Sequence, residues 1–250
     1  MNPKPRRPVL RKPEKLKVRA NLQGRTEHFT VYAQPSLPAG GAHHARAVLA
    51  RCEDDYQRIR RFFGGIEAGP FNVILFWHPA GAYHDTCAAR DLFCDAPIRP
   101  DAGEYSEFLT VMEFVEVFES RQGRGWSCGK SNGEGLSRVL GKELYPHLLD
   151  GFATAASWLD SPRKNFVDRN YQSDLNDRAN GCSALFLNWL HVQLRYQWKE
   201  IVGAGGPTLG ATYATLTGKK DGFEKFRALL DAHFPRGRKS RLATDNPFPL

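Results

Sequence analysis

A continuous apolar run in the middle of the chain constrains the fold more than any other feature. Eight of the eleven residues from Phe108 to Phe118 are apolar, and they are spread around the whole helical projection. A helix of this kind is expected to be buried on every side. Only Thr110, Glu113 and Glu116 are polar in the run, and a buried carboxylate must be protonated, paired with a cation or bound to a metal. The sequence therefore predicts a core helix that carries two acids.

Patterns on both sides of this run predict the other elements. A strand over 27–33, an amphipathic helix over 42–63 and an apolar strand over 71–77 precede it, and residues 91–95 have the composition of a short edge strand. Helical patterns fill most of the chain from residue 131 onward. Strands early and helices late predict an α+β fold, in which a small mixed sheet packs on the buried helix and a mostly helical half follows.

The positive charge lies at the two ends of the chain. Of the formal net charge of +8, residues 1–20 contribute +7 and residues 236–250 contribute +3, which leaves −2 for the residues between them. A nucleic-acid groove in the folded body is therefore not expected, although either end could contact an acidic partner or nucleic acid. We predict a basic, proline-rich flexible arm over 1–22, one domain over 23–235 and a basic tail over 236–250. The domain is expected to have a sheet-containing part over 23–119 and a helical part over 120–235.

The five cysteines form no C-x-x-C pair. Cys87 and Cys94, with six residues between them, could form a local disulfide, and the other cysteines are expected to be free thiols. No apolar segment follows the basic start, so neither a signal peptide nor a transmembrane helix is predicted. We therefore expect a cytoplasmic protein that does not bind a membrane.

Two short motifs resemble the metal-binding motifs of the gluzincin metallopeptidases. The chain reads M-E-F-V-E over 112–116 and N-G-E-G over 132–135. In gluzincins an H-E-x-x-H helix supplies two zinc-binding histidines and a general-base glutamate, and a later helix supplies a third ligand. The resemblance implies a general-base role for Glu113 and a ligand role for Glu134. It extends over about residues 27–235, because the later helical patterns resemble those of the basic secretory proteins, and it implies a metallopeptidase-like domain.

The two histidine positions of the H-E-x-x-H motif are occupied by Met112 and Glu116 in this chain. Methionine is a poor zinc ligand, whereas the carboxylates of Glu116 and Glu134 suit calcium, magnesium or manganese better than zinc. The degenerate motif therefore implies Glu116 and Glu134 as candidate ligands of a divalent metal. Tightly bound zinc is expected to be absent, and general peptidase activity with it.

The three glutamates also have purely structural interpretations. Ser131 and Glu134 have the spacing of a capping box, and Glu134 could also pair with Arg138 one helical turn later. Glu113 and Glu116 could belong to a buried ion-pair network with a nearby Arg or Lys. These alternatives carry about the same weight as the ligand and catalytic roles.

Four further residues are candidates for a cleft near the core helix, namely His84, Asp91, Arg138 and His191. His84 and its neighbour His78 are single histidines without a second His or Cys at metal-site spacing, which favours loop hydrogen bonding over metal ligation. His191 lies among leucines, which is typical of a core histidine with one hydrogen-bond partner.

Three functions are compatible with these patterns. The sequence favours a non-proteolytic binding or scaffold protein for an unknown protein or peptide, which has lost the zinc-binding histidines and needs no cofactor. The first alternative is a hydrolase that uses Glu113, Glu116 and Glu134 with a hard divalent metal, or as a carboxylate acid/base pair. The second alternative is an accessory assembly protein that binds an acidic partner through its basic ends.

Overall fold

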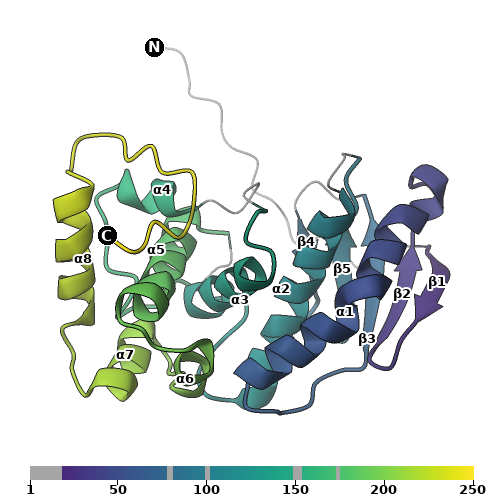
Figure 1. Ribbon diagram of the computed structural model, residues 1–250, viewed down its shortest axis with the longest axis horizontal. Coiled ribbons are helices and arrows are strands. Elements are labelled where there is room, and N and C mark those ends of the chain that lie inside the picture. Colours follow the sequence, from purple (N-terminus) through teal and green to yellow (C-terminus); the bar gives the residue numbers. More distant parts are fainter. Residues whose placement is uncertain (1–18, 78–80, 99–101, 149–153, 173–174) are drawn as a thin grey trace.

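The computed structural model describes most of the chain and has one sheet beside two groups of helices (Figure 1). The arm predicted over 1–22 lies outside the described residues except at its end, which enters the first strand. His78 also lies outside them. The described residues are 19–77, 81–98, 102–148, 154–172 and 175–250.

Within the described residues, five strands form a mixed sheet of order β1-β2-β3-β5-β4. The three inner strands are parallel, and β1 and β4 pair antiparallel at the two edges. The predicted edge strand 91–95 is therefore an inner strand, because the short strand β4 covers its outer side through the pair Tyr83 and Phe93. The strands are β1 (Asn21–Arg25), β2 (Phe29–Ala33), β3 (Phe71–Phe76), β4 (Ala82–Tyr83) and β5 (Asp91–Asp95).

Eight α-helices are present among the described residues. A 3₁₀ turn (η1, Pro38–Gly41) leads into the first helix, and a π-helical turn (η2, Trp189–Gln193) extends the fifth. No helix in the described ranges has both the length and the apolar composition needed to cross a bilayer. The helices are α1 (Ala42–Phe62), α2 (Ala102–Gln122), α3 (Ser131–Leu144), α4 (Ala155–Leu159), α5 (Asp177–Asn188), α6 (Trp198–Gly203), α7 (Leu209–Thr217) and α8 (Gly222–His233).

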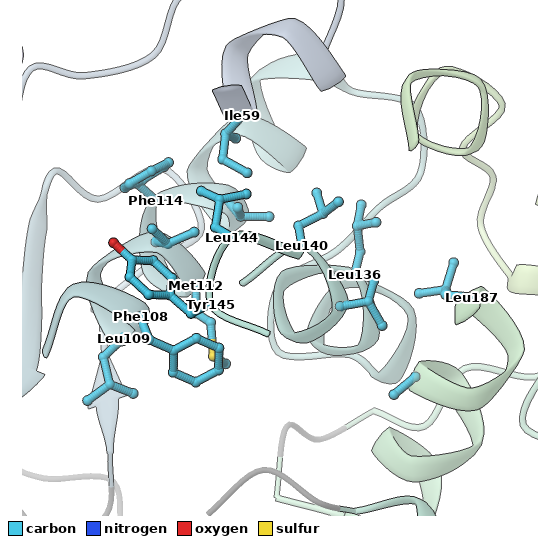
Figure 2. Packing of buried hydrophobic residues seen from close by; sticks show 14 of the residues in the cluster. Ile59, Phe108, Leu109, Met112, Phe114, Leu136, Leu140, Leu144, Tyr145 and Leu187 are labelled. Carbon is cyan, nitrogen blue, oxygen red and sulfur yellow. The ribbon is translucent and has the colours of Figure 1, made fainter. Parts of the chain in front are cut away.

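Helix α2 is central to the core, as its apolar run predicts. All eleven residues from 108 to 118 are buried. Phe114 points to the sheet, where its ring centroid lies 5.7 Å from that of Phe29 and 5.9 Å from that of Phe71. The opposite side of α2 packs on α3, where Met112 and Leu140 belong to the same buried cluster (Figure 2). The predicted packing of the sheet on this helix is confirmed, and α2 is buried all round because α1, α3 and the sheet surround it.

The helices from α3 to α8 form a second group on the other side of α2 (Figure 1). Residues 236–250, predicted as a basic tail, run back over this group. Asp245 is 6% exposed and accepts a hydrogen bond from the backbone N–H of Ala155 at 2.6 Å. The side chain of Asn188 donates to the carbonyl oxygen of Asp245 at 2.9 Å. This segment therefore fastens α4 to α5.

Candidate functional site

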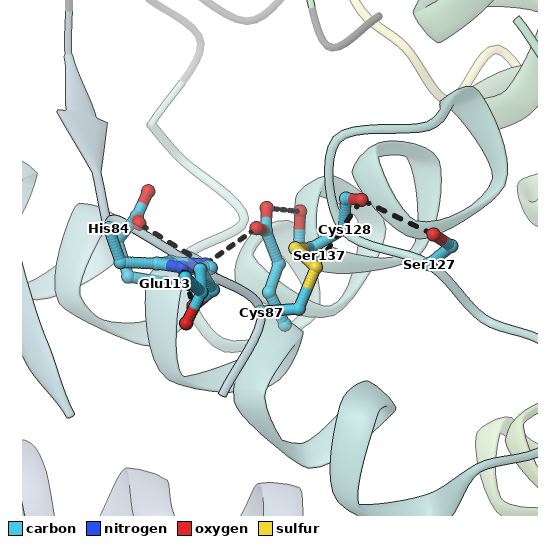
Figure 3. Close-up of a disulfide and its surroundings, with 8 residues drawn as sticks. His84, Cys87, Glu113, Ser127, Cys128 and Ser137 are labelled. Carbon is cyan, nitrogen blue, oxygen red and sulfur yellow. Dashed lines mark hydrogen bonds and ion pairs between the residues drawn. A yellow bond between two sulfur atoms is a disulfide. The ribbon is translucent and has the colours of Figure 1, made fainter. Parts of the chain in front are cut away.

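A cluster of acidic side chains lies where α2, α3 and the turn after β4 meet. Glu113, Glu116 and Glu119 are spaced three residues apart on α2, so they share one flank of the helix, and all three are buried. Glu134 on α3 is 8% exposed. His84, which follows β4, reaches the same place (Figure 3). The four glutamates and His84 together form the acidic cluster.

His84 is held in one orientation by its two ring nitrogens. Its Nδ1 lies 2.6 Å from the carbonyl oxygen of Thr86, which can only accept, so Nδ1 carries the hydrogen. Its Nε2 lies 2.9 Å from Glu116 Oε2 and 3.8 Å from Glu113 Oε2. The side chain of His84 is 3% exposed. The loop hydrogen bond that the sequence favoured is therefore present, and the other ring nitrogen makes His84 part of the acidic cluster.

The electrostatics of the cluster favour a cationic group at the His84 position. Burial alone would lower the pKa of His84, but the hydrogen bond and the negative charge of Glu116 outweigh it, so the pKa of His84 is raised above its usual value. The second oxygen of Glu116 accepts a hydrogen bond from the hydroxyl of Ser137 at 3.2 Å. Glu116 thereby joins α2 to both His84 and α3.

The predicted capping box at the start of α3 is wrong. The N-cap residue is Lys130, and Ser131 lies inside the helix. The hydroxyl of Ser131 accepts a hydrogen bond from the backbone N–H of Tyr171 at 2.9 Å. The predicted pairing of Glu134 with Arg138 is present at 3.7 Å. The charge of Glu134 also acts on His84 and Glu119, so Glu134 belongs to the acidic cluster, with Arg138 as its neighbour on α3.

Two glycines set the position of Glu134. A Cβ atom on Gly133 would clash with the carbonyl oxygen of Ser127, and one on Gly135 would lie 2.5 Å from the Cβ of Ser183. Contacts this close exclude any side chain. The first turn of α3 is thus pressed between the preceding loop and α5, with Glu134 between the two contacts.

Glu119 is the member of the cluster that the sequence analysis missed. Its side chain is 0% exposed, and neither carboxylate oxygen has a hydrogen-bond partner among the described residues. Burial raises its pKa well above the usual range, and the charges of Glu116 and Glu134 add to the effect. Asp55, another buried acid, differs from Glu119 because it accepts a 2.5 Å hydrogen bond from the hydroxyl of Tyr145. The sequence does contain a signal for Glu119, because glutamate recurs at every third residue over positions 113, 116 and 119.

Glu119 is expected to lower the stability of the protein. A buried polar group without a partner costs about 1–3 kcal/mol, so Glu119→Met should raise the free energy of unfolding by a similar amount. Urea unfolding measures the change. Glu119→Gln is the matched control and should give no such gain, because the amide is also left without partners. A loss of stability in Glu119→Met would contradict this assignment.

A disulfide lies next to the cluster. It joins Cys87, three residues after His84, to Cys128 in the loop before α3, with Cα atoms 5.6 Å apart. The predicted disulfide between Cys87 and Cys94 is therefore wrong, because Cys94 is a buried thiol on β5 that accepts a hydrogen bond from Thr110. The expectation of free thiols holds for three of the five cysteines. The disulfide fastens the turn that carries His84 to the loop that leads into α3.

Two of the predicted cleft residues lie outside the cluster. Asp91 is exposed at the start of β5, where it accepts a hydrogen bond from the side chain of Asn72 at 2.7 Å. His191 lies in η2 with Nδ1 2.7 Å from the carbonyl oxygen of Tyr196, and its ring stacks on Trp198 with centroids 4.3 Å apart. Both side chains have structural contacts of their own. Of the four cleft candidates, His84 and Arg138 lie at the site.

Comparison with known proteins gives no match to any family model, to any curated protein or to any solved structure. A fold by itself does not define an activity. The function must therefore be argued from the chemistry of the acidic cluster.

Proposed function

We propose that the protein is a hydrolase that uses a divalent cation held by His84, Glu116 and Glu134, with Glu113 as the general base. This is the first alternative considered for the sequence, and the resemblance to gluzincins implies the same roles for Glu113 and Glu134. The observation that carries the proposal is the orientation of His84. Histidines that bind metals commonly donate one ring N–H to a carbonyl oxygen, as Nδ1 of His84 does to Thr86.

His84 offers the nitrogen ligand that the degenerate motif lacks. Its Nε2 faces two carboxylates at 2.9 and 3.8 Å, and a third, Glu134, contributes to its electrostatic environment. One imidazole with carboxylate oxygens suits cations such as manganese or magnesium. A cation would also offset the cost of burying several carboxylates in one place.

The residues have separable tasks in such a reaction. A divalent cation polarises a carbonyl or phosphoryl oxygen and acidifies water. Glu113, next to the ligands but farther from Nε2 of His84 than Glu116 is, can accept a proton from the attacking water. Ser137 holds Glu116 in place through its hydroxyl.

A non-proteolytic binding protein is the second candidate, and one observation favours it. His84 and Glu116 already form a direct hydrogen bond at 2.9 Å, and Arg138 lies 3.7 Å from Glu134. These pairs can offset the charges of Glu116 and Glu134 without a cation. On this proposal the partner is a protein or peptide, and the basic ends contact an acidic partner.

Cation binding by the disulfide-bonded protein tests the proposed function. Calorimetric titration with Mn²⁺ should give one binding event, and a panel of chromogenic ester, peptide and phosphate substrates should be hydrolysed only with the cation present. His84→Gln should weaken Mn²⁺ binding by at least about tenfold. His191→Gln is the matched control and should leave binding unchanged. Absence of Mn²⁺ binding in the wild-type protein would exclude this function and leave the binding protein.

A further inference from the structure

The disulfide brings two sulfur atoms next to the acidic cluster. The proposed hydrolase does not use these sulfur atoms. One ligand atom each of His84, Glu116 and Cys128 lie within 4.8 Å of one another, and Cys87 is bonded to Cys128. One nitrogen, one carboxylate oxygen and the sulfur of Cys128 therefore meet at one place, and the sulfur of Cys87 is bonded to that of Cys128. His84 and Cys87 are separated by two residues, a spacing common among zinc ligands.

We propose that reduction of the Cys87–Cys128 disulfide creates a zinc site formed by Cys87, Cys128, His84 and Glu116. A dithiol reductant supplies two electrons and two protons, which break the sulfur–sulfur bond and leave two thiols, while the reductant becomes a disulfide. Zinc then displaces the two thiol protons and binds both thiolates. The site goes beyond the proposed function, because it needs neither Glu113 nor Glu134.

For His84, Glu116 and Cys128 the geometry requires only small movements. Tetrahedral zinc with ligand distances of about 2.0–2.3 Å separates its ligand atoms by about 3.3–3.8 Å, compared with the limit of 4.8 Å for His84, Glu116 and Cys128. The ring of His84 is already fixed through Thr86 with Nε2 facing Glu116. The ligands come from the turn after β4, from α2 and from the loop before α3. Zinc would thus hold together the same segments that the disulfide joins.

The remaining cysteines are poorly suited to bind zinc. Cys52, Cys94 and Cys182 are buried, and burial raises the pKa of all three thiols, to about 11 for Cys52. Metal binding requires the thiolate. Cys87 and Cys128 are only half-buried and stand beside a fixed imidazole. The sulfur chemistry of the chain is therefore concentrated at this site.

The zinc site would also regulate the hydrolase, a consequence that rests on the proposed function. His84 and Glu116 are ligands in both arrangements, so they cannot serve both cations at once. The disulfide leaves both residues to the cluster with Glu113 and Glu134. Reduction in the presence of zinc withdraws them. Hydrolysis is expected under oxidising conditions and inhibition under reducing conditions with zinc.

Cobalt titration of the full-length protein tests the zinc site directly. The protein is first reduced with a phosphine, which binds metals weakly. Added Co²⁺ should then produce a thiolate-to-cobalt charge-transfer band and the strong visible bands of tetrahedral cobalt. One equivalent of Zn²⁺ should displace the cobalt and remove these bands. The oxidised protein is the matched control and should lack the thiolate-to-cobalt charge-transfer band. Reduced protein that is folded by circular dichroism but lacks the charge-transfer band would overturn the proposal.

Two variants separate this site from other thiols. In reduced protein, Cys128→Ser should abolish the charge-transfer band and weaken zinc binding by more than about 100-fold, whereas Cys52→Ser should keep both. Equal bands in Cys128→Ser would place the metal elsewhere and overturn the proposal. Mn²⁺ binding by the oxidised protein is a separate measurement. Loss of one proposal therefore leaves the other standing.

Discussion

Replacing Glu113 by Gln is expected to lower kcat of the cation-dependent hydrolysis by about 10²–10⁴-fold, the range for removal of a general base. Glutamine keeps the shape of the side chain but cannot take the proton from water. The affinity for Mn²⁺ should change by only a few-fold, because Glu116, at 2.9 Å, and not Glu113, at 3.8 Å, is the carboxylate closer to Nε2 of His84. Initial rates with saturating Mn²⁺ measure the first effect and calorimetry the second.

Glu107 on the same helix provides a matched control for Glu113. It lies near Arg51 and Tyr145, away from the acidic cluster, and burial raises its pKa to about 7. Glu107→Gln should therefore leave kcat within about twofold of the wild type, because it is no part of the general-base chemistry. If Glu113→Gln kept the wild-type rate, Glu113 would not be the base. If Glu113→Gln lost Mn²⁺ binding, Glu113 would be a ligand instead.

Truncating Phe114 to alanine should lower the free energy of unfolding by about 3–5 kcal/mol, the range for a buried phenylalanine. The centroid of its ring lies 5.7 Å from that of Phe29 and 5.9 Å from that of Phe71, both on the sheet, and 6.4 Å from that of Tyr56 on α1. The cavity left by the ring would lie between the sheet, α1 and α2. All three elements would lose contacts with the Phe114 ring. Urea unfolding followed by tryptophan fluorescence measures the loss.

Phe166→Ala is the control for the truncation of Phe114. Phe166 is only half-buried, and its ring meets the partly exposed Tyr171. Its removal should cost about 1 kcal/mol, because little apolar area is returned to water. A loss as small as this for Phe114→Ala would contradict the central position of α2 in the core.

The sequence predicted the elements whose signals are local. The apolar run of α2, the periodic pattern of α1 and the apolar strand β3 identify themselves within a few residues, and the ends of α1 and β3 differ from the predictions by one residue. The position of β5 inside the sheet was not predictable in this way. Its outer neighbour β4 has two residues, too few for a pattern, and pairing across a sheet is a long-range contact.

The site was predicted in part for the same reason. Glu113 and Glu116 are recognisable because they interrupt an apolar helix, whereas His84 reaches them from a separate turn. The pairing of Cys87 with Cys128 spans a sequence separation of 41 and depends on how that turn meets α3. A short spacing made Cys94 the more plausible partner in the sequence, but Cys94 lies on an inner strand, where its thiol is buried. Tertiary contacts decide these pairings.

The close packing of α3 also offers a way to recognise distant relatives of this chain. Gly133 and Gly135 cannot be replaced without moving Ser127 or Ser183, so both glycines should persist in relatives whether or not their chemistry does. A search pattern can therefore combine G-E-G with an upstream helix that carries glutamate at three-residue intervals. Among the proteins that it finds, covariation between Glu119 and the other four residues of the acidic cluster would distinguish a site that is under selection from one that is only inherited.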